Sequence, residues 1–329
     1  MMLQLQNPFN KKPLRISPGG LSEENAEDVF PLKNGAYRIA GNTNYAENFG
    51  FQWNKFVATQ IDKTAKIDYT IKRFFAATGW DKENLEGKNV LEVGSGAGRF
   101  TQIVLDHTPA TIYSVDYSEA VEANYKNNGP NNRLFLFLAS IYEMPFAKGQ
   151  FDKVFCFGVL QHTPHIEKSI ASLIEMAKPG AEVIVDFYPI NGWWSTLNAK
   201  YILRPITKKM SNEKLYRIIN NNIDWLIKAN RFFSNIGLGK IVNRFLPICD
   251  IEGTLPTNLS KTQMREMCLL DTFDMFSPEY DQPQKIATIE KLFKKYGMKD
   301  VWGGTIKYNN SKVTLVKGIK PLDISEPLL

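Results

Sequence analysis

Cysteine, histidine and long apolar runs are all scarce in this chain of 329 residues. The three cysteines, Cys156, Cys249 and Cys268, are scattered and in no paired spacing. They indicate reduced thiols and give neither a disulfide framework nor a zinc site. No apolar run approaches the roughly 18 residues expected of a membrane-spanning helix. Residues 1–20 lack the charged-then-apolar pattern of a signal peptide, so we expect a cytoplasmic protein.

Acidic residues are scarce in one region, and the basic charge of the chain is concentrated there. The net charge is +6, but the segment from Trp193 to Pro247 has ten basic residues opposed only by Glu213 and Asp224, a net charge of +8. With its aromatic residues, such a segment suits an anionic acceptor or the surface of an anionic membrane. A solvated basic face over an aromatic core explains it equally well. No RNA- or DNA-binding motif accompanies the charge, so nucleic acid is not the expected partner.

Strand and helix patterns alternate regularly in the middle of the chain. Short apolar runs predict strands at 89–93, 111–116, 133–138, 153–157 and 182–187. Helical patterns lie between them at 99–106, 118–127 and 164–177. The last of these helices has Thr163 as its expected N-cap and Lys178-Pro179-Gly180 as its stop. This alternation predicts a doubly wound, parallel α/β sheet.

The flanking segments have different patterns. Prolines and glycines interrupt residues 1–44, which predicts an irregular arm with one hairpin that turns at Asn34-Gly35. Residues 45–80 are largely helical in pattern and rich in aromatic residues. Helices are also expected at 212–220, 223–233, 264–270 and 284–296, and closing strands at 298–305 and 312–316. We therefore divide the chain into an N-terminal part (1–80), a core (81–189), a helical insertion (190–283) and a core completion (284–329).

The stretch from Val90 to Gly98 joins a buried strand to a helix through a glycine-rich turn. Gly94, Gly96 and Gly98 let a ligand approach bare backbone, and the start of the helix offers unpaired N–H groups. The spacing is G-x-G-x-G, whereas dinucleotide-binding loops read G-x-G-x-x-G. Glu92 lies two residues before the first glycine.

Glu92 and this glycine spacing resemble motif I of the class I S-adenosylmethionine (SAM) methyltransferases. Three later phrases resemble the same family in order and spacing: Asp116-Tyr117, Leu138 to Phe146, and Phe151 to Pro164. The resemblance implies a Rossmann-like, mostly parallel seven-stranded sheet with an antiparallel last strand, and a helical insertion that acts as a lid. It also implies SAM as cofactor and S-adenosylhomocysteine (SAH) as product.

The resemblance assigns roles to particular residues. Those expected to bind SAM are Glu92, Gly94, Ser95, Gly96, Gly98, Asp116, Tyr117, Ser140, Ile141, Gly158 and Val159. Asp116 would accept the ribose hydroxyls, although it could merely cap the helix that begins near Ser118. Ser140 stands where the family has an acidic residue, so the backbone of Ile141 is expected to carry more of the adenine contact.

His162 is the first candidate for a catalytic base. Methyl transfer is an in-line displacement, and a base is needed only where the acceptor must lose a proton. A histidine has a suitable pKa for that role, with Asp186 or Tyr188 as the second candidate. His162 also fits a purely structural role in its loop. No metal-ligand spacing is evident.

These patterns predict a SAM-dependent methyltransferase that modifies an oxygen or nitrogen of a small molecule or glycan precursor. Residues 203–209 and 270–283 resemble phrases of bacterial methyltransferases encoded among surface-glycan and cell-envelope genes. The aromatic residues of 45–80 are expected to pack helices on the sheet. The family resemblance suggests the alternative that Phe51-Gln52-Trp53 closes over the cofactor. Two alternatives stay open: an NAD(P)-dependent oxidoreductase, which the glycine spacing disfavours, and a non-catalytic SAM-binding or scaffold protein, which Ser140 allows.

Overall fold

The computed structural model describes residues 3–24, 28–40, 45–55, 69–190, 192, 194, 197–255, 259–308 and 311–322. The strands are β1 (Leu5–Gln6), β2 (Pro13–Ser17), β3 (Gly20–Glu23), β4 (Asp28–Lys33), β5 (Ala36–Arg38), β6 (Asn89–Val93), β7 (Thr111–Asp116), β8 (Leu134–Leu138), β9 (Phe151–Cys156), β10 (Ala177–Asp186), β11 (Lys299–Tyr308) and β12 (Ser311–Ile319). The α-helices are α1 (Glu47–Lys55), α3 (Tyr69–Thr78), α4 (Arg99–His107), α5 (Ala120–Asn128), α6 (Ile166–Met176), α7 (Ala199–Thr207), α8 (Asn212–Asn235), α9 (Gly239–Val242), α10 (Ile251–Thr254), α11 (Lys261–Phe276) and α12 (Ile286–Lys295). Short 3₁₀ helices are η2 (Trp80–Lys82), η3 (Leu160–His162) and η5 (Asn243–Phe245).

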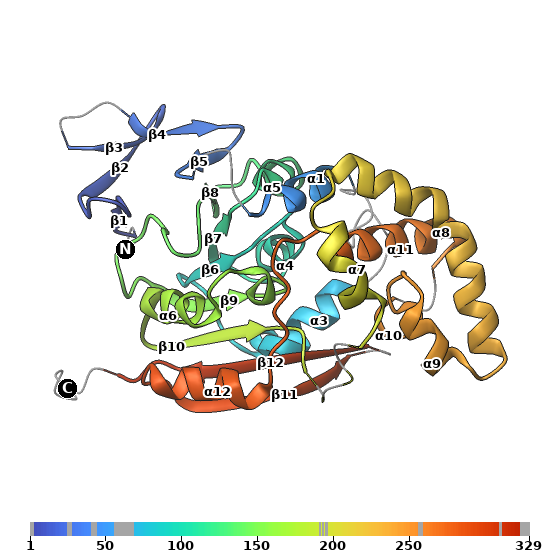
Figure 1. Ribbon diagram of the computed structural model, residues 1–329. Helices are drawn as coiled ribbons and strands as arrows, with labels where there is room; N and C mark the ends of the chain where they lie inside the picture. Colours follow the sequence, from blue (N-terminus) through green and yellow to red (C-terminus); the bar gives the residue numbers. More distant parts are fainter. Residues whose placement is uncertain are drawn as a thin grey trace.

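A twelve-stranded sheet in the order β1-β2-β3-β4-β5-β8-β7-β6-β9-β10-β12-β11 runs through the molecule (Figure 1). β8, β7, β6, β9 and β10 are parallel, and β12 is antiparallel to both of its neighbours. These strands with β11 form the expected Rossmann-like sheet of seven strands, so the predicted fold is confirmed. Its carboxyl edge, where ligands bind in such sheets, faces the helical insertion.

The described part of residues 1–40 extends this sheet, so the prediction of an irregular arm was wrong. β5 pairs in parallel with β8, and β1 to β5 are linked by antiparallel pairs. Pro13 is the first residue of β2, a place where a missing N–H is tolerated. The expected hairpin is confirmed, since Asn34 and Gly35 have φ values of 50° and 78° and join β4 to β5.

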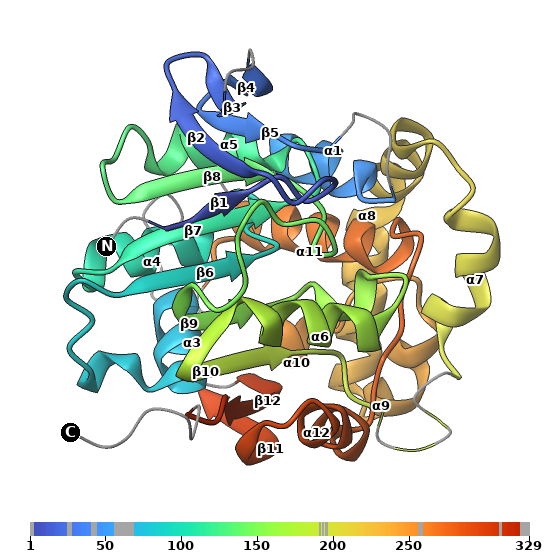
Figure 2. The ribbon, with the colours of Figure 1, turned by 90° about the vertical axis from the view of Figure 1, so that its left-hand side faces the viewer.

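Helices cover both faces of the sheet. α3, α4 and α5 contact one face, while α6 and α12 contact the other. Figure 2 shows the strands of the sheet side by side, with the helices of the insertion at one end. Phe74 of α3 is fully buried and meets the rings of Trp80, Phe100, Phe155 and Phe157. This aromatic cluster holds α3 on the sheet.

Several boundaries differ from the sequence prediction. The N-cap of α6 is His165, because the hydroxyl of Thr163 donates to the carbonyl of Leu160 instead. β10 already begins at Ala177, so Lys178-Pro179-Gly180 is an irregular part of the strand. The helices expected at 212–220 and 223–233 form one helix, α8, because its apolar residues keep a single face against α11.

The insertion has a hydrophobic core of its own. Leu215, Ile219 and Ile223 of α8 are buried together with Phe273 and Phe276 of α11. α1 contacts both α5 and α11 and so links the insertion to the sheet domain. The insertion is therefore a packed helical unit placed at the carboxyl edge of the strands (Figure 1).

We predict that Phe74→Ala lowers the free energy of unfolding by about 3–5 kcal/mol, since a fully buried ring is replaced by a cavity. Phe9→Ala is the matched control, because Phe9 is 59% exposed, and it should change stability by less than about 1 kcal/mol. Chemical denaturation followed by circular dichroism measures both. Equal effects of the two substitutions would show that α3 is not held by this cluster.

Candidate functional site

The glycine loop after β6 has a backbone that only glycine adopts without strain. Gly94, Gly96 and Gly98 have φ values of 82°, 52° and 83°. A Cβ atom at Gly94 would lie 2.0 Å from Cγ2 of Val159, and one at Gly98 would lie 2.1 Å from Oδ1 of Asn124. The loop therefore packs directly against the loop after β9, and the sequence prediction of close backbone approach fits this geometry.

Asp116, at the end of β7, holds the glycine loop in place. One carboxylate oxygen accepts the N–H of Gly96 at 2.7 Å. The other accepts the N–H of Ser118 at 2.8 Å and its hydroxyl at 2.6 Å. Burial raises the pKa of Asp116, and these three donors oppose that rise. The side chain thus joins two loops and does not cap α5, whose N-cap is Glu119. Its expected ribose contact stays a prediction.

Glu92 lies beneath the loop in a buried polar network. Its Oε2 accepts hydrogen bonds from the hydroxyls of Thr101 and Ser114, while Asn124 donates to Thr101 at 2.9 Å. Burial raises the pKa of Glu92 to about 7. Asn128 extends the network to the carbonyl of Gly98 at 3.0 Å. Glu92 therefore organises the loop from below, and its expected contact with the amino-acid end of SAM stays a prediction.

The loop after β9 is fixed by Asp186, at the end of β10. Its carboxylate accepts the N–H of Gly158 and forms an ion pair with Arg73 of α3. Asp186 is only 3% exposed and both of its oxygens are engaged, so it is a poor candidate for a base. The contact positions Gly158 and Val159 next to the glycine loop. Arg73 is a residue that the sequence analysis missed, because its helix gives no motif.

The residues expected to bind adenine lie along the ends of β7 and β8. The hydroxyl of Ser140 accepts a hydrogen bond from the N–H of Tyr142 at 3.2 Å. Ser140 stands where the sequence analysis expected an acidic residue. Among the described residues, no acceptor takes the backbone N–H of Ile141. The ring of Tyr117 lies 5.1 Å from that of Tyr45. Tyr45, which precedes α1, was not predicted from the sequence as a neighbour of Tyr117.

Buried polar atoms that lack a hydrogen-bond partner in the protein indicate where a polar ligand such as SAM could bind. Within the described parts of the chain, Ser95 Oγ, Gln52 Oε1, Glu92 Oε1 and both amide atoms of Gln161 make no hydrogen bond to protein. Ser95, Gln52 and Gln161 are each at most 3% exposed. Orphaned buried polar atoms are costly unless a ligand or water satisfies them. Ser95 belongs to the glycine loop itself, so a polar cofactor such as SAM would satisfy its hydroxyl.

His162, in η3, is buried and its tautomer is determined by its contacts. Nδ1 lies 3.0 Å from the carbonyl oxygen of Tyr280, which can only accept, so Nδ1 carries the proton and Nε2 has the lone pair. Burial lowers the pKa of His162, although the carboxylate of Asp274 opposes this effect. The ring packs against Phe49 and Tyr188 at centroid distances of 5.1 and 5.7 Å.

α11 supplies two carboxyl groups to the same region. The hydroxyl of Tyr188 donates to Asp274 at 3.2 Å. Burial and then the nearby Asp274 raise the pKa of Asp271 to about 7, while Arg99 and Arg73 lower it. Lys200 pairs with Asp281 at 2.7 Å and lies 4.7 Å from the centre of the Tyr188 ring. These two carboxyl groups could have been recognised from the sequence, because residues three apart on a predicted helix share one face.

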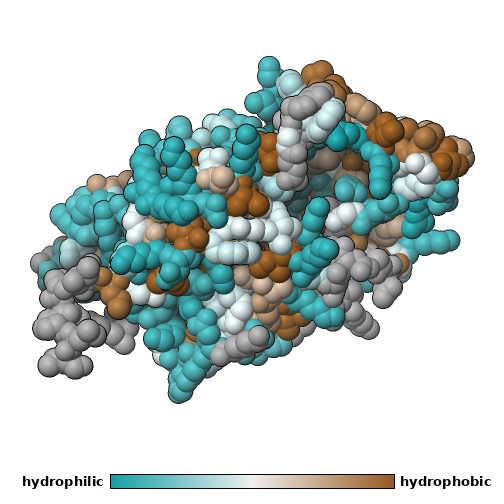
Figure 3. Space-filling view, turned by 90° about the horizontal axis from the view of Figure 1, so that it is seen from below, coloured by the Kyte–Doolittle hydropathy of each residue, from teal (hydrophilic) through white to brown (hydrophobic). Residues whose placement is uncertain are grey.

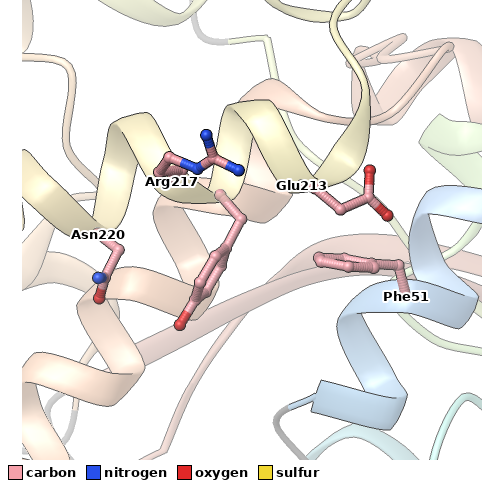
Figure 4. A pocket seen from close by; sticks show the side chains of 5 residues that line it. Phe51, Glu213, Arg217 and Asn220 are labelled. Carbon is pink, nitrogen blue, oxygen red and sulfur yellow. The ribbon is translucent and has the colours of Figure 1, made fainter.

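A pocket of about 240 Å³ lies where α1 meets the insertion, lined by Phe51, Glu213, Tyr216, Arg217 and Asn220. In Figure 4 Phe51 extends from α1 toward α8. Its ring lies 5.6 Å from that of Phe273 of α11. Phe51 thus packs on the insertion. The expected closure of Phe51-Gln52-Trp53 over the cofactor stays a prediction, and the side chain of Trp53 lies outside the described residues.

We predict that Gly94→Ala weakens SAH binding at least about tenfold, since the methyl group would displace Val159 and strain the loop. Gly87→Ala is the matched control, because Gly87 has φ of 68° but no atom within 4 Å of an added Cβ. It adds the same kind of backbone strain without crowding. Isothermal titration calorimetry measures the affinity of both variants for SAH. Equal losses of affinity would show that Gly94 is not part of the binding site.

We also predict a pH-dependent effect of Glu92→Gln on stability. The pKa of Glu92 is about 7 in the folded protein, compared with an ordinary value of 4.5. A carboxyl with a raised folded pKa contributes stability that is complete below the ordinary pKa and is lost as the pH rises through the folded pKa. The wild type should therefore lose up to about 3 kcal/mol relative to the variant between about pH 4 and pH 8. Denaturation across this range tests it, with the exposed Glu86→Gln as control, and a constant difference would contradict it.

Comparison with known proteins identifies the central segment. Residues 91–185 match the family model described as a methyltransferase domain. A tRNA U34 carboxymethyltransferase of Nautilia profundicola is 30% identical over 149 residues, which are 44% of this chain and 48% of that protein. A ubiquinone biosynthesis O-methyltransferase of Pseudomonas fluorescens is 30% identical over 133 residues, which are 38% of this chain and 56% of that protein. The chain thus spans about half the length of these two relatives.

Among solved structures, magnesium protoporphyrin IX methyltransferase of Synechocystis with bound SAH matches with a TM-score of 0.45 and 16% identity, over 84% of this chain and 96% of that one. The segment that matches the methyltransferase domain contains the glycine loop, Asp116 and the loop after β9. The glycine loop alone allowed either SAM or a nicotinamide dinucleotide, and the match to a methyltransferase domain favours SAM. Residues 91–185 are therefore similar to a methyltransferase domain, and SAM is the cofactor that this similarity implies.

Proposed function

We propose that the protein transfers the methyl group of SAM to an oxygen of a small molecule or glycan precursor. Nitrogen is the alternative acceptor atom. When bound, SAM supplies a methyl group on a positively charged sulfur. The observation that carries the proposal is the tautomer of His162, a residue of η3 in the loop after β9, whose Nε2 carries the lone pair.

His162 suits the role of a general base for a hydroxyl acceptor. Its lowered pKa keeps the imidazole neutral at neutral pH, and the carbonyl of Tyr280 holds the proton on Nδ1. Nε2 is therefore free to take the proton of an incoming hydroxyl. The packing of Phe49 and Tyr188 on the ring fixes its orientation. An amine acceptor that is already neutral would need no such base, so this arrangement favours oxygen.

The insertion, residues 190–283, is proposed to close the acceptor side of the site. Two carboxylates, Asp274 and Asp281, and one lysine, Lys200, act on His162 on that side, so carboxylates outnumber cations there. Carboxyl groups accept hydrogen bonds from hydroxyls, and they repel anions. We therefore favour a hydroxyl-bearing acceptor over an anionic one. The basic residues of the insertion that are exposed, such as Lys208, lie on its outer surface.

The proposed acceptor class also rests on sequence likeness. Phrases at 203–209 and 270–283 resemble those of methyltransferases from surface-glycan and cell-envelope gene clusters. One curated relative is an O-methyltransferase of ubiquinone biosynthesis. Another is named for a tRNA nucleotide, which makes RNA the second acceptor to test.

We predict that His162→Ala leaves the affinity for SAH within about twofold and lowers turnover roughly 10²–10⁴-fold, as for loss of a general base. His165→Ala is the matched control, because His165 is exposed and lies three residues away on the same loop. It should leave turnover unchanged. If His162→Ala retains full turnover, His162 takes no part in the proton transfer.

The acceptor is tested with methyl-labelled SAM and three groups of acceptors: nucleotide sugars, phenols and catechols, and bulk tRNA. Label recovered as an alkali-stable O-methyl group on a sugar or phenol supports the proposal. Label recovered only in tRNA would replace it with RNA modification. Saturable SAH binding without transfer to any of the three groups would favour the non-catalytic alternative.

A further inference from the structure

Large apolar side chains are exposed mainly on one part of the molecule. Of the 18 large apolar residues that are exposed among the described residues, 11 lie between Trp194 and Phe245. Figure 3 shows apolar side chains gathered at the right-hand end of the molecule, the end that carries α8 and α9 in Figure 1. Single exposed apolar residues are ordinary, but a cluster of this kind marks an interaction surface.

On α8 these residues form a regular stripe. Ile218, Trp225 and Phe232 are 43%, 52% and 58% exposed and are spaced seven residues apart, so they share one face of the helix. Lys214 and Lys228 are also exposed and fall on the same face at helical spacing. The opposite face, with Leu215, Ile219 and Ile223, is the one buried against α11. The stripe is therefore directed away from the protein core.

The turn after α8 continues the apolar surface. Ile236, Leu238 and Ile241 are 51%, 47% and 68% exposed, and Lys240 beside them is exposed as well. α9 packs against α8, so the turn lies alongside the end of the stripe. We call the stripe and this turn together the outer face. Its residues are Lys214, Ile218, Trp225, Lys228, Phe232 and the turn 236–241.

The chemistry of the outer face points to one kind of partner. Lysines interleaved with aromatic and branched aliphatic side chains match a surface that is anionic outside and apolar beneath. The segment from Trp193 to Pro247 has a net charge of +8. None of the described helices is long and apolar enough to cross a membrane. Contact with a bilayer would therefore be peripheral, with α8 lying along the surface.

We propose that the outer face docks the protein on an anionic lipid bilayer. Phe232, Ile236 and Ile241 enter the boundary between headgroups and acyl chains, and Lys214 and Lys228 remain at the level of the lipid phosphates. The sheet domain and the loop of His162 stay on the aqueous side. This docking is independent of methyl transfer, so its test and the test of the proposed function fail separately.

A nucleic acid or a second copy of the chain explains the outer face less well. Phosphate contacts use lysines, but Ile218, Leu238 and Ile241 would have no partner on a nucleic-acid backbone. A second copy would bring Lys214 and Lys228 against equally basic surfaces, which is unfavourable. Both occupants nevertheless give distinct results in the experiment below.

The test is sedimentation of the full chain with vesicles of phosphatidylcholine, with and without phosphatidylglycerol. We expect binding only to the anionic vesicles, weakened at high salt. The double variant Phe232→Ser/Ile241→Ser should bind at least about tenfold more weakly, because two inserted side chains are lost. Emission of Trp225 should shift to shorter wavelength on binding, and Trp225→Phe should remove that shift.

The matched control is Phe9→Ser/Ile16→Ser, which makes the same two changes at residues that are 59% and 51% exposed. Phe9 lies in the turn between β1 and β2, and Ile16 lies on β2. It should bind vesicles like the wild type. Lys214→Gln/Lys228→Gln serves as a second variant and should weaken binding without removing an apolar side chain. Absence of vesicle binding, equal loss in the control, or binding of RNA or self-association through the outer face in place of lipid would each overturn the proposal.

Discussion

The site depends on one hydrogen-bonded carboxylate at the end of β7. Asp116 joins the N–H of Gly96, in the loop after β6, to the N–H and hydroxyl of Ser118, ahead of α5. Two adjacent parallel strands end at the same edge, and this contact ties their two loops together. Glu92 and Asn128 support the glycine loop from below. Because the loop is held on both sides, its left-handed glycines stay in the one conformation that leaves room beside Val159.

The neighbouring strands repeat this arrangement for the second half of the site. Asp186 at the end of β10 holds the N–H of Gly158 and pairs with Arg73 of α3. The insertion then brings α11 over the same edge, and Tyr280 beside it determines the tautomer of His162. One face of α8 packs on α11, and its other face is available to a partner. In the proposed function, the sheet supplies the cofactor side, and the insertion supplies both the acceptor side and the outer face.

Much of this could be predicted from the sequence, and the failures have physical causes. β6 and β7 were predicted to the residue, because buried parallel strands are continuous apolar runs with clear ends. The N-terminal strands were missed, since a pattern broken by proline was attributed to a loop, whereas Pro13 stands where a strand tolerates it. Arg73, Asp271 and Asp274 were not predicted as site residues, because only tertiary packing brings α3 and α11 to the glycine loop. The partners of Asp186 were not predicted for the same reason, as they come from α3 and the loop after β9.

The most direct test of the account is a calorimetric titration of the full chain with SAH and, separately, with NAD. The geometry predicts saturable binding of one SAH per chain, because Asp116 holds the glycine loop and the buried hydroxyl of Ser95 within that loop makes no hydrogen bond to the described protein residues. It predicts no binding of NAD under the same conditions. Saturable binding of NAD, or no binding of SAH to the folded protein, would contradict the assignment of this site to SAM.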